Sequence, residues 1–248
     1  MSVSIIIPAK GSSERVPKKN LLDLNGHSLV YSACDKCLGV PSIDNVYIDT
    51  ESQEIIDDVT PLIEKGLRVI RRPDKMADND TSGNDLIVFE QSMIDKCDLV
   101  LHTYATSPFI TTETIESCIE TFQSKQARYL CYDRQKQTID HASRGLIYDS
   151  FFTALPVKEY FWSKGKPVNF DLDTLPNSQN LGTMWVETHG LYGITWNALT
   201  KFRRRLGERV LPIQINEDEA LDINTPLDYE KAVKQHEQRT EKTLRESV

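Results

Sequence analysis

Short apolar runs alternate with amphipathic stretches over the first half of the chain. The apolar runs predict buried strands at residues 3–7, 45–48, 67–71, 98–103 and 127–132. The periodicity between them predicts helices near residues 28–38, over 52–64, from Ser82 onward and over 112–122, with Pro61 shortening the second one. Strands that alternate with helices are typical of an α/β protein. We therefore expect a parallel, doubly wound sheet that binds ligands at the carboxyl ends of its strands.

This alternation is lost between about residues 133 and 188. The stretch is richer in polar, aromatic, proline and glycine residues. We interpret it as an insertion of irregular strands and loops inside a single domain that spans residues 1–248. Long excursions from a compact sheet are usually functional or bound to a partner, so the insertion is a candidate lid or dimer arm. Regular structure returns with strands at 190–194 and 210–215, a helix at 197–206 and a last helix capped by Thr225.

Composition then narrows the class of protein. With 248 residues, 39% of them hydrophobic, the chain can bury a sizeable core. The net charge of -8 argues against nucleic acid as a partner. The five cysteines are an odd number spread through apolar segments, which favours a reducing compartment over a disulfide framework. The sequence has neither a signal-peptide pattern nor an apolar run of the ~18 residues that a membrane span needs. We expect a cytoplasmic protein.

The first predicted strand runs into a small-residue turn at residues 10–20. This turn holds four cations and one acid, namely Lys10, Arg15, Lys18, Lys19 and Glu14. Backbone N–H groups and cations after a buried strand suit a polyphosphate, so the turn is a candidate site for a nucleoside triphosphate. It has neither the closing Gly-Lys-Ser/Thr of a P-loop nor the three spaced glycines of a dinucleotide fold. The alternative is a solvated loop with ordinary surface lysines.

A second candidate is Asp222-Ile223-Asn224, just before the last predicted helix. Residues two apart in an extended segment point to the same side, so two oxygen-bearing side chains are in position to hold Mg²⁺ beside a phosphate. The alternative is that Asn224 forms a local turn while Asp222 lies in solvent. A third candidate is the hydroxyl-rich run 103–108, which either faces the ligand crevice or only ends a strand.

Weaker signals have simpler explanations. Cys34 and Cys37 have redox spacing, but they lie in an apolar helical stretch without a second pair, which favours core packing. The arginines at 203–205 are interpreted as a solvated helix face, with a phosphate contact from a partner subunit as the alternative. The absence of a Gly-x-Ser-x-Gly elbow argues against a Ser-His-Asp hydrolase.

Four motifs occur in order along residues 3–235. They are Ile-Pro-Ala-Lys-Gly-Ser-Ser at 7–13, continued by Pro17, Lys19 and Asn20; Arg72-Pro73 with Asp80-Thr81-Ser82; Ala105-Thr106-Ser107-Pro108; and Asp222-Ile223-Asn224-Thr225. Together they resemble the motifs of the acylneuraminate cytidylyltransferases, the enzymes that make CMP-sialic acid, and of relatives acting on similar keto-sugar acids.

The resemblance implies a Rossmann-like nucleotidyltransferase that works as a homodimer, with the insertion reaching the partner's site. It implies that CMP passes from CTP to the acceptor, with Mg²⁺ as cofactor. The implied catalytic residues are Lys10, Arg15, Lys19 and Asp222. The implied nucleotide contacts are Ala9, Lys10, Gly11, Ser12, Asn20, Arg72, Ser82 and Asn84. The implied acceptor contacts are Tyr104, Thr106, Ser107, Glu187 and His189, and the implied metal ligands are Asp222 and Asn224.

Four positions depart from the family pattern. Lys10 replaces an arginine and loses its two-pronged geometry. Asn224 replaces the second metal aspartate, and Tyr104 replaces a glutamine that contacts the sugar. Glu187 replaces an arginine near the acceptor carboxylate, which it would repel, so an acceptor with an amino group is one expectation. The nucleotide half of the site is retained and the acceptor half is changed.

The sequence therefore favours a cytidylyltransferase that activates a sialic-acid-like acceptor and releases pyrophosphate. Two alternatives stay open. A nucleotide-sugar glycosyltransferase would use an Asp-x-Asp motif, for which Asp171 and Asp173 are candidates inside the insertion. A non-catalytic nucleotide-binding homologue would explain Asn224 and Glu187.

Overall fold

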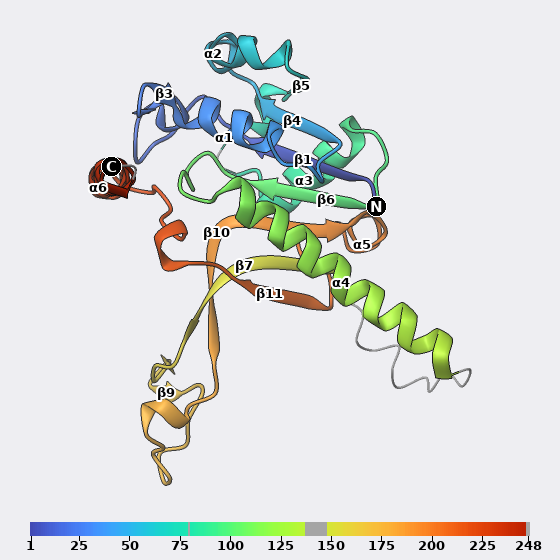
Figure 1. Cartoon of the computed structure of the whole chain (residues 1–248), viewed down its shortest axis with the longest axis vertical. Helices are drawn as coiled ribbons and strands as arrows, with labels where there is room; N and C mark the ends of the chain where they lie inside the picture. The colour runs from blue at the N-terminus through green and yellow to red at the C-terminus, as the bar shows by residue number, and fades with distance from the viewer. Residues whose placement is uncertain (79, 137–147, 247–248) are drawn as a thin grey trace.

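The structure is a computed structural model that describes residues 1–78, 80–136 and 148–246 (Figure 1). One seven-stranded sheet has the order β11-β7-β10-β6-β1-β4-β5. Neighbouring strands are parallel except around β10, which is antiparallel to β6 and β7. Its strands are β1 (Val3–Pro8), β4 (Asn45–Thr50), β5 (Leu67–Arg71), β6 (Leu99–Thr103), β7 (Ser150–Val157), β10 (Met184–Thr195) and β11 (Val210–Gln214). The predicted α/β, mainly parallel sheet is confirmed.

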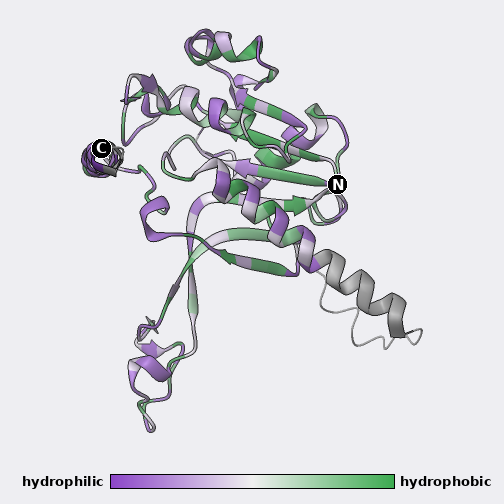
Figure 2. Ribbon diagram, viewed as in Figure 1, coloured by the Kyte–Doolittle hydropathy of each residue, from purple (hydrophilic) through white to green (hydrophobic). Residues whose placement is uncertain are grey.

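Helices cover both faces of this sheet. They are α1 (Leu29–Leu38), α2 (Gln53–Ile63), α3 (Gly83–Met93), α4 (Thr112–Lys136), α5 (Trp196–Phe202) and α6 (Pro226–Glu246). Two core clusters show the double winding: one joins the sheet to α1, α2 and α4, and the other joins it to α3 and α5. Figure 2 shows the strands as largely hydrophobic and α6 as largely hydrophilic. Within the described ranges, no helix is both long and apolar enough to cross a membrane.

The alternation of side chains along β1 explains how one strand serves both layers. Val3, Ile5 and Ile7 belong to the first cluster, whereas Ile6 belongs to the second, and all four are fully buried. The strand then ends at Pro8, and the basic turn begins with Lys10 two residues later at the carboxyl edge. A run of β-branched residues thus fixes where the following turn emerges.

The helix starts follow the expected capping chemistry. Ser28, Ser52 and Ser82 each accept a hydrogen bond from the backbone N–H three residues later. Pro61 lies inside α2, which continues to Ile63. The proline therefore falls in the last turn, where it shortens the helix little.

One predicted strand is wrong. Residues 127–132 do not form a strand, because α4 continues through them to Lys136. The stretch from Thr112 to Lys136 contains no glycine or proline, so nothing in its sequence ends the helix at the predicted residue 122. The strand that joins the sheet is instead β7, which the sequence analysis had assigned to the irregular insertion.

The irregular part of the insertion is shorter than predicted and forms an arm. Beyond the sheet, β7 and β10 continue as a two-stranded ribbon, with Ala154 opposite Glu187 and Val157 opposite Met184. The ribbon carries residues 158–183, which include the short hairpin of β8 (Trp162–Ser163) and β9 (Lys166–Pro167) and project away from the body (Figure 1). Residues 137–147 of the predicted insertion lie outside the described residues. A second short hairpin, β2 (Asp23–Leu24) with β3 (His27–Ser28), precedes α1.

Candidate functional site

The three segments selected from the sequence lie together at the carboxyl edge of the sheet. Arg15 Nη2 donates to Asn224 Oδ1 at 3.0 Å, and Lys19 Nζ donates to the Ile223 carbonyl at 3.0 Å. The Ile223 backbone N–H in turn donates to the Thr106 carbonyl at 2.8 Å. Ile223 itself is fully buried, so it anchors this segment in the core. The basic turn, the loop after β6 and the segment before α6 therefore form one structural unit.

A cavity of about 420 Å³ opens at this junction. Seven of the predicted site residues line it, together with Pro8, Ser13 and Glu14; the seven are Lys10, Ser12, Arg15, Lys19, Asn20, Tyr104 and Thr106. Partial burial lowers the pKa of Lys19, and the neighbouring Asp222 opposes that effect. Three cations around one cavity in an acidic protein create a local site for a polyanion.

The backbone of the basic turn is held in a fixed shape. Asn20 Nδ2 donates to the Lys10 carbonyl at 2.8 Å and braces the turn from inside. A Cβ on Gly11 would lie 2.6 Å from the Ser52 Cβ, so only glycine fits there. The Gly11 N–H donates to Glu51 Oε1 at 2.7 Å, which places a carboxylate on an amide expected to meet phosphate. Ala9 is fully buried, and its N–H donates to the Asp49 carbonyl.

Not every cation of the turn faces the cavity. Lys18 adopts a left-handed backbone conformation with φ of 51°, and its amine pairs with Glu54 of α2 at 2.7 Å. Both side chains of that pair are mostly exposed. The turn thus presents Lys10, Arg15 and Lys19 on one side and Lys18 on the other.

Of the two predicted metal ligands, Asp222 has the surroundings better suited to a cation. Its Oδ2 accepts from Asn224 Nδ2 at 2.6 Å, whereas its Oδ1 is buried without a hydrogen-bond partner among the described residues. A buried carboxylate oxygen of this kind is suited to a cation. The oxygen of Asn224 already accepts a hydrogen bond from the cationic Arg15, so Asn224 is a weaker ligand for a metal in this arrangement. The parts of the chain that the structure describes contain no cluster of three or more His, Cys, Asp or Glu suited to a metal.

Two residues expected near the base serve the scaffold in this structure. Arg72 is 5% exposed, and its Nη2 and Nε bind the Asp49 carboxylate at 2.7 and 2.9 Å. Burial raises the pKa of Asp49 to about 7, and the hydrogen bonds from Arg72 oppose that shift. Ser82 caps α3 by accepting the Asp85 N–H and also donates to the Asp85 carboxylate.

The predicted acceptor residues form a polar network beside the cavity. Tyr192 donates its hydroxyl to Glu187 Oε2 at 2.8 Å, and His189 Nδ1 lies 2.8 Å from that same hydroxyl. His189 has φ of 58° where β10 bulges between Glu187 and Tyr192, which turns its side chain toward Tyr192. Tyr104 meets Tyr192 edge to face, with ring centroids 6.3 Å apart.

Ser107 lies deeper than expected. It is 2% exposed, and its hydroxyl is buried without a partner among the described residues. Its N–H donates to the Tyr104 carbonyl at 3.0 Å, which closes the turn after β6. Thr106 lines the cavity, so this run contributes Tyr104 and Thr106 to the surface and Ser107 to the support below it.

Sequence reasoning missed Arg205. Its Nη1 donates to the Tyr104 hydroxyl at 3.0 Å, and its guanidinium lies over the Tyr192 ring, 3.8 Å from the centroid. Asn84, expected at the nucleotide, accepts the Arg205 backbone N–H at 3.0 Å. The predicted helix 197–206 ends earlier, at Phe202, because Arg203 adopts φ of 51° and reverses the chain. The interpretation of residues 203–205 as one solvated helix face is therefore wrong for Arg205.

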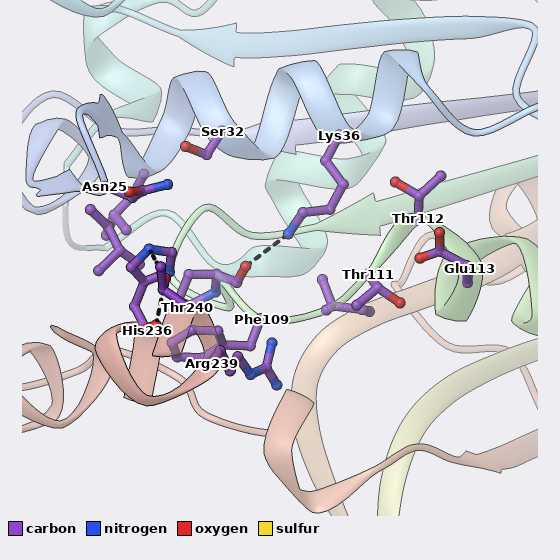
Figure 3. Close-up of a pocket in the computed structure, with 14 residues that line it drawn as sticks. Asn25, Ser32, Lys36, Phe109, Thr111, Thr112, Glu113, His236, Arg239 and Thr240 are labelled. Atoms are coloured by element: carbon purple, nitrogen blue, oxygen red, sulfur yellow. Dashed lines mark hydrogen bonds between the residues drawn. The ribbon is translucent and has the colours of Figure 1, made fainter. Parts of the chain in front are cut away.

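Figure 3 shows a second cavity, of about 600 Å³, between α1, the loop after β6 and α6. Lys36 Nζ donates to the Pro108 carbonyl at 2.9 Å, and the Arg239 guanidinium lies 4.5 Å from the centroid of the Phe109 ring. Burial lowers the pKa of Lys36 to about 8. None of the predicted site residues lines this cavity. Cys34 and Cys37 on the same helix are buried, free thiols, which confirms their assignment to the core.

Comparison with known proteins places this site in a context. The chain is 28% identical over 130 residues to a pseudaminic acid cytidylyltransferase of Campylobacter jejuni subsp. jejuni serotype O:2, a match that covers 50% of this chain and 55% of that protein. It is 25% identical over 190 residues to an 8-amino-3,8-dideoxy-manno-octulosonate cytidylyltransferase of Shewanella piezotolerans, covering 73% of each. The chain thus spans about half the length of the Campylobacter relative.

Solved structures share the fold. A CMP:2-keto-3-deoxy-manno-octonic acid synthetase complexed with CTP superposes with a TM-score of 0.61 at 15% identity, covering 96% of this chain and all of that one. A 4-diphosphocytidyl-2C-methyl-D-erythritol synthase of Anaerococcus prevotii gives 0.56 at 16% identity, covering 94% of both. The sequence pattern of the family described as cytidylyltransferase matches residues 4–159, which is more than half of the chain. On this match, the chain belongs to the cytidylyltransferase family.

Proposed function

We propose that this protein transfers CMP from CTP to a keto-sugar acid of the sialic-acid-like class and releases pyrophosphate. The observation that carries the proposal is the direct contact of Arg15 and Lys19, which line the cavity, with the segment 222–224. The activities of the related proteins, on pseudaminic acid and on an 8-amino octulosonate, supply the class of acceptor. The chemistry needed is mainly positioning and charge neutralisation, which this cavity offers.

The chain's own groups have distinct tasks in this reaction. An acceptor hydroxyl oxygen attacks the α-phosphorus of CTP in line and gives its proton to water, the bond from that phosphorus to the bridging oxygen breaks, and pyrophosphate leaves. Lys10, Arg15 and Lys19 bind the triphosphate oxygens and stabilise the charge that develops on the leaving group. The turn is braced before CTP arrives, through Asn20 and the close packing of Gly11. Little reorganisation is then needed at the moment of transfer.

Mg²⁺ is part of the proposal. The buried Oδ1 of Asp222 is a suitable ligand, and phosphate oxygens and water would complete the set, as Mg²⁺ prefers. When bound, the ion would neutralise phosphate charge. Asn224 fits this role less well, since its oxygen accepts from Arg15. The nucleotide contacts Ala9, Gly11, Ser12, Arg72, Ser82 and Asn84 stay predictions, because the structure gives several of these groups partners within the protein.

We further propose that the protein is a homodimer in which the arm of each subunit contacts the partner subunit. Large hydrophobic side chains are exposed there in unusual density: Tyr160, Trp162, Val168, Leu172, Leu175, Trp185 and Val186. An exposed apolar surface of this kind indicates contact with a partner. Light scattering on the intact chain should give twice the mass of 28.3 kDa. We also place the protein in the cytoplasm, where CTP is available and its described thiols stay reduced.

A pyrophosphate-release screen tests the function. Each of CTP, UTP, ATP and GTP is incubated with Mg²⁺ and with pseudaminic acid, 3-deoxy-manno-octulosonate or its 8-amino analogue. We expect release with CTP and at least one acid, and much less with the other triphosphates. CTP binding without release over the whole panel would support a non-catalytic homologue instead. The glycosyltransferase alternative has little support, since Asp171 accepts the backbone N–H groups of Asp173 and Thr174 in a local turn on the arm.

A further inference from the structure

Arg205 has unused binding capacity at the edge of the candidate site. Its guanidinium has five N–H donors, and among the described residues one of them makes a hydrogen bond, to the Tyr104 hydroxyl. The nearest carboxylate oxygen, Oε2 of Glu187, is 3.9 Å from Nη2, which is too long for a hydrogen bond. The side chain is 28% exposed, so these donors are accessible to a ligand.

The position of Arg205 is fixed from three sides. The Tyr192 ring lies beneath its guanidinium, the Tyr104 hydroxyl holds Nη1, and Asn84 holds its backbone N–H. An arginine held flat on an aromatic ring loses little freedom when it binds, and its planar fork matches a carboxylate. Because Tyr104 also lines the candidate triphosphate cavity, its hydroxyl joins Arg205 to the edge of that cavity.

The charges around Arg205 favour a singly charged ligand. Glu187 faces it across 3.9 Å, and the hydroxyls of Tyr104 and Tyr192 and the ring of His189 surround the pair. Glu187 partly neutralises the arginine, so a dianionic phosphate would meet repulsion that a carboxylate meets less. The sequence analysis predicted that Glu187 repels the acceptor carboxylate. The positive charge of Arg205, 3.9 Å from Glu187, offsets that repulsion.

We propose that Arg205 binds the carboxylate of the acceptor, with Tyr104 and Tyr192 as its platform and Glu187 as its resting counter-ion. This inference rests on the proposed function, because that function supplies an acceptor acid. It names a binding residue for the substrate that the family motifs along this chain do not include.

The test compares each acid of the panel with its methyl ester, which lacks the negative charge. Binding is measured by saturation-transfer NMR without CTP, and KM and kcat are measured by pyrophosphate release. The variants are Arg205→Met and the matched control Arg203→Asn, which removes an exposed arginine two residues away and tolerates the left-handed backbone. Arg205→Lys keeps the charge and loses the fork.

We expect Arg205→Met to weaken acid binding and to raise the acceptor KM roughly 10- to 150-fold, the range for hydrogen bonds to charged groups. In Arg205→Met, the KM for CTP should change less than about twofold and the preference for acid over ester should vanish. The acceptor KM of Arg205→Lys should lie between those of the wild type and Arg205→Met. Arg203→Asn should behave as the wild type. If the wild type binds acid and ester equally, or if Arg205→Met weakens both equally, the inference is overturned. Binding that discriminates without any turnover would reject the proposed function and retain Arg205.

Discussion

Asp222→Asn is the substitution that examines the metal assignment most directly. It preserves the shape of the side chain and removes its charge, including that of the buried Oδ1 without a partner. Two unit charges 4 Å apart interact by about 4 kcal/mol at an effective dielectric constant of about 20. If that interaction is made mainly in the transition state, its loss lowers kcat by roughly a thousand-fold. CTP binding should persist within about tenfold, because Lys10, Arg15 and Lys19 remain.

The assay is initial-rate pyrophosphate release at saturating CTP and acceptor over a range of Mg²⁺, with CTP affinity from calorimetry. Asp228→Asn is the matched control, since Asp228 lies in the first turn of α6, directly after the segment that holds Asp222, and accepts the N–H groups of Asn224 and Thr225. Asparagine keeps an oxygen that accepts these N–H groups and loses only the charge, so the variant should cost no more than about 1 kcal/mol of stability and change kcat less than about threefold. Full turnover by Asp222→Asn, or an equal loss in both variants, would refute the reasoning.

Three further changes follow from particular contacts. Gly11→Ala places a Cβ 2.6 Å from that of Ser52, so it should destabilise the protein by about 1–3 kcal/mol in urea; an unchanged midpoint would contradict the packing argument. Asn224→Asp should lower the Mg²⁺ concentration for half-maximal rate by roughly threefold, and a higher requirement would count against the site. Lys36 has a folded pKa of about 8 against 10.5, so wild-type stability should rise from pH 8 to 10.5 relative to Lys36→Met; a constant difference would exclude that titration.

The sequence predicted the parts of this fold that depend on local chemistry. The β-branched run of β1 and the serine caps at positions 28, 52 and 82 place strands and helices from their own residues. The strand expected at 127–132 failed because apolar residues also suit a helix that nothing interrupts. Apolar runs alone do not distinguish the two.

The candidate site divides in the same way. The convergence of the basic turn with residues 222–224 was predictable, because the carboxyl ends of parallel strands share one edge. Arg205 was not, because its place depends on Arg203 adopting a backbone conformation that non-glycine residues rarely enter. The pairing of Glu187 with Tyr192 likewise depends on a bulge in β10 that leaves no mark in the sequence pattern.

The Glu51 carboxylate accepts the Gly11 N–H, so the protein itself provides an anion inside the basic turn. A nucleotide phosphate that binds the Gly11 N–H, as proposed, would first have to displace the Glu51 carboxylate. Inorganic phosphate would make few other contacts to offset the cost of displacing Glu51. A triphosphate would also contact Lys10, Arg15 and Lys19. On the proposed function, this competition within the turn would favour a triphosphate over small anions at the Gly11 N–H.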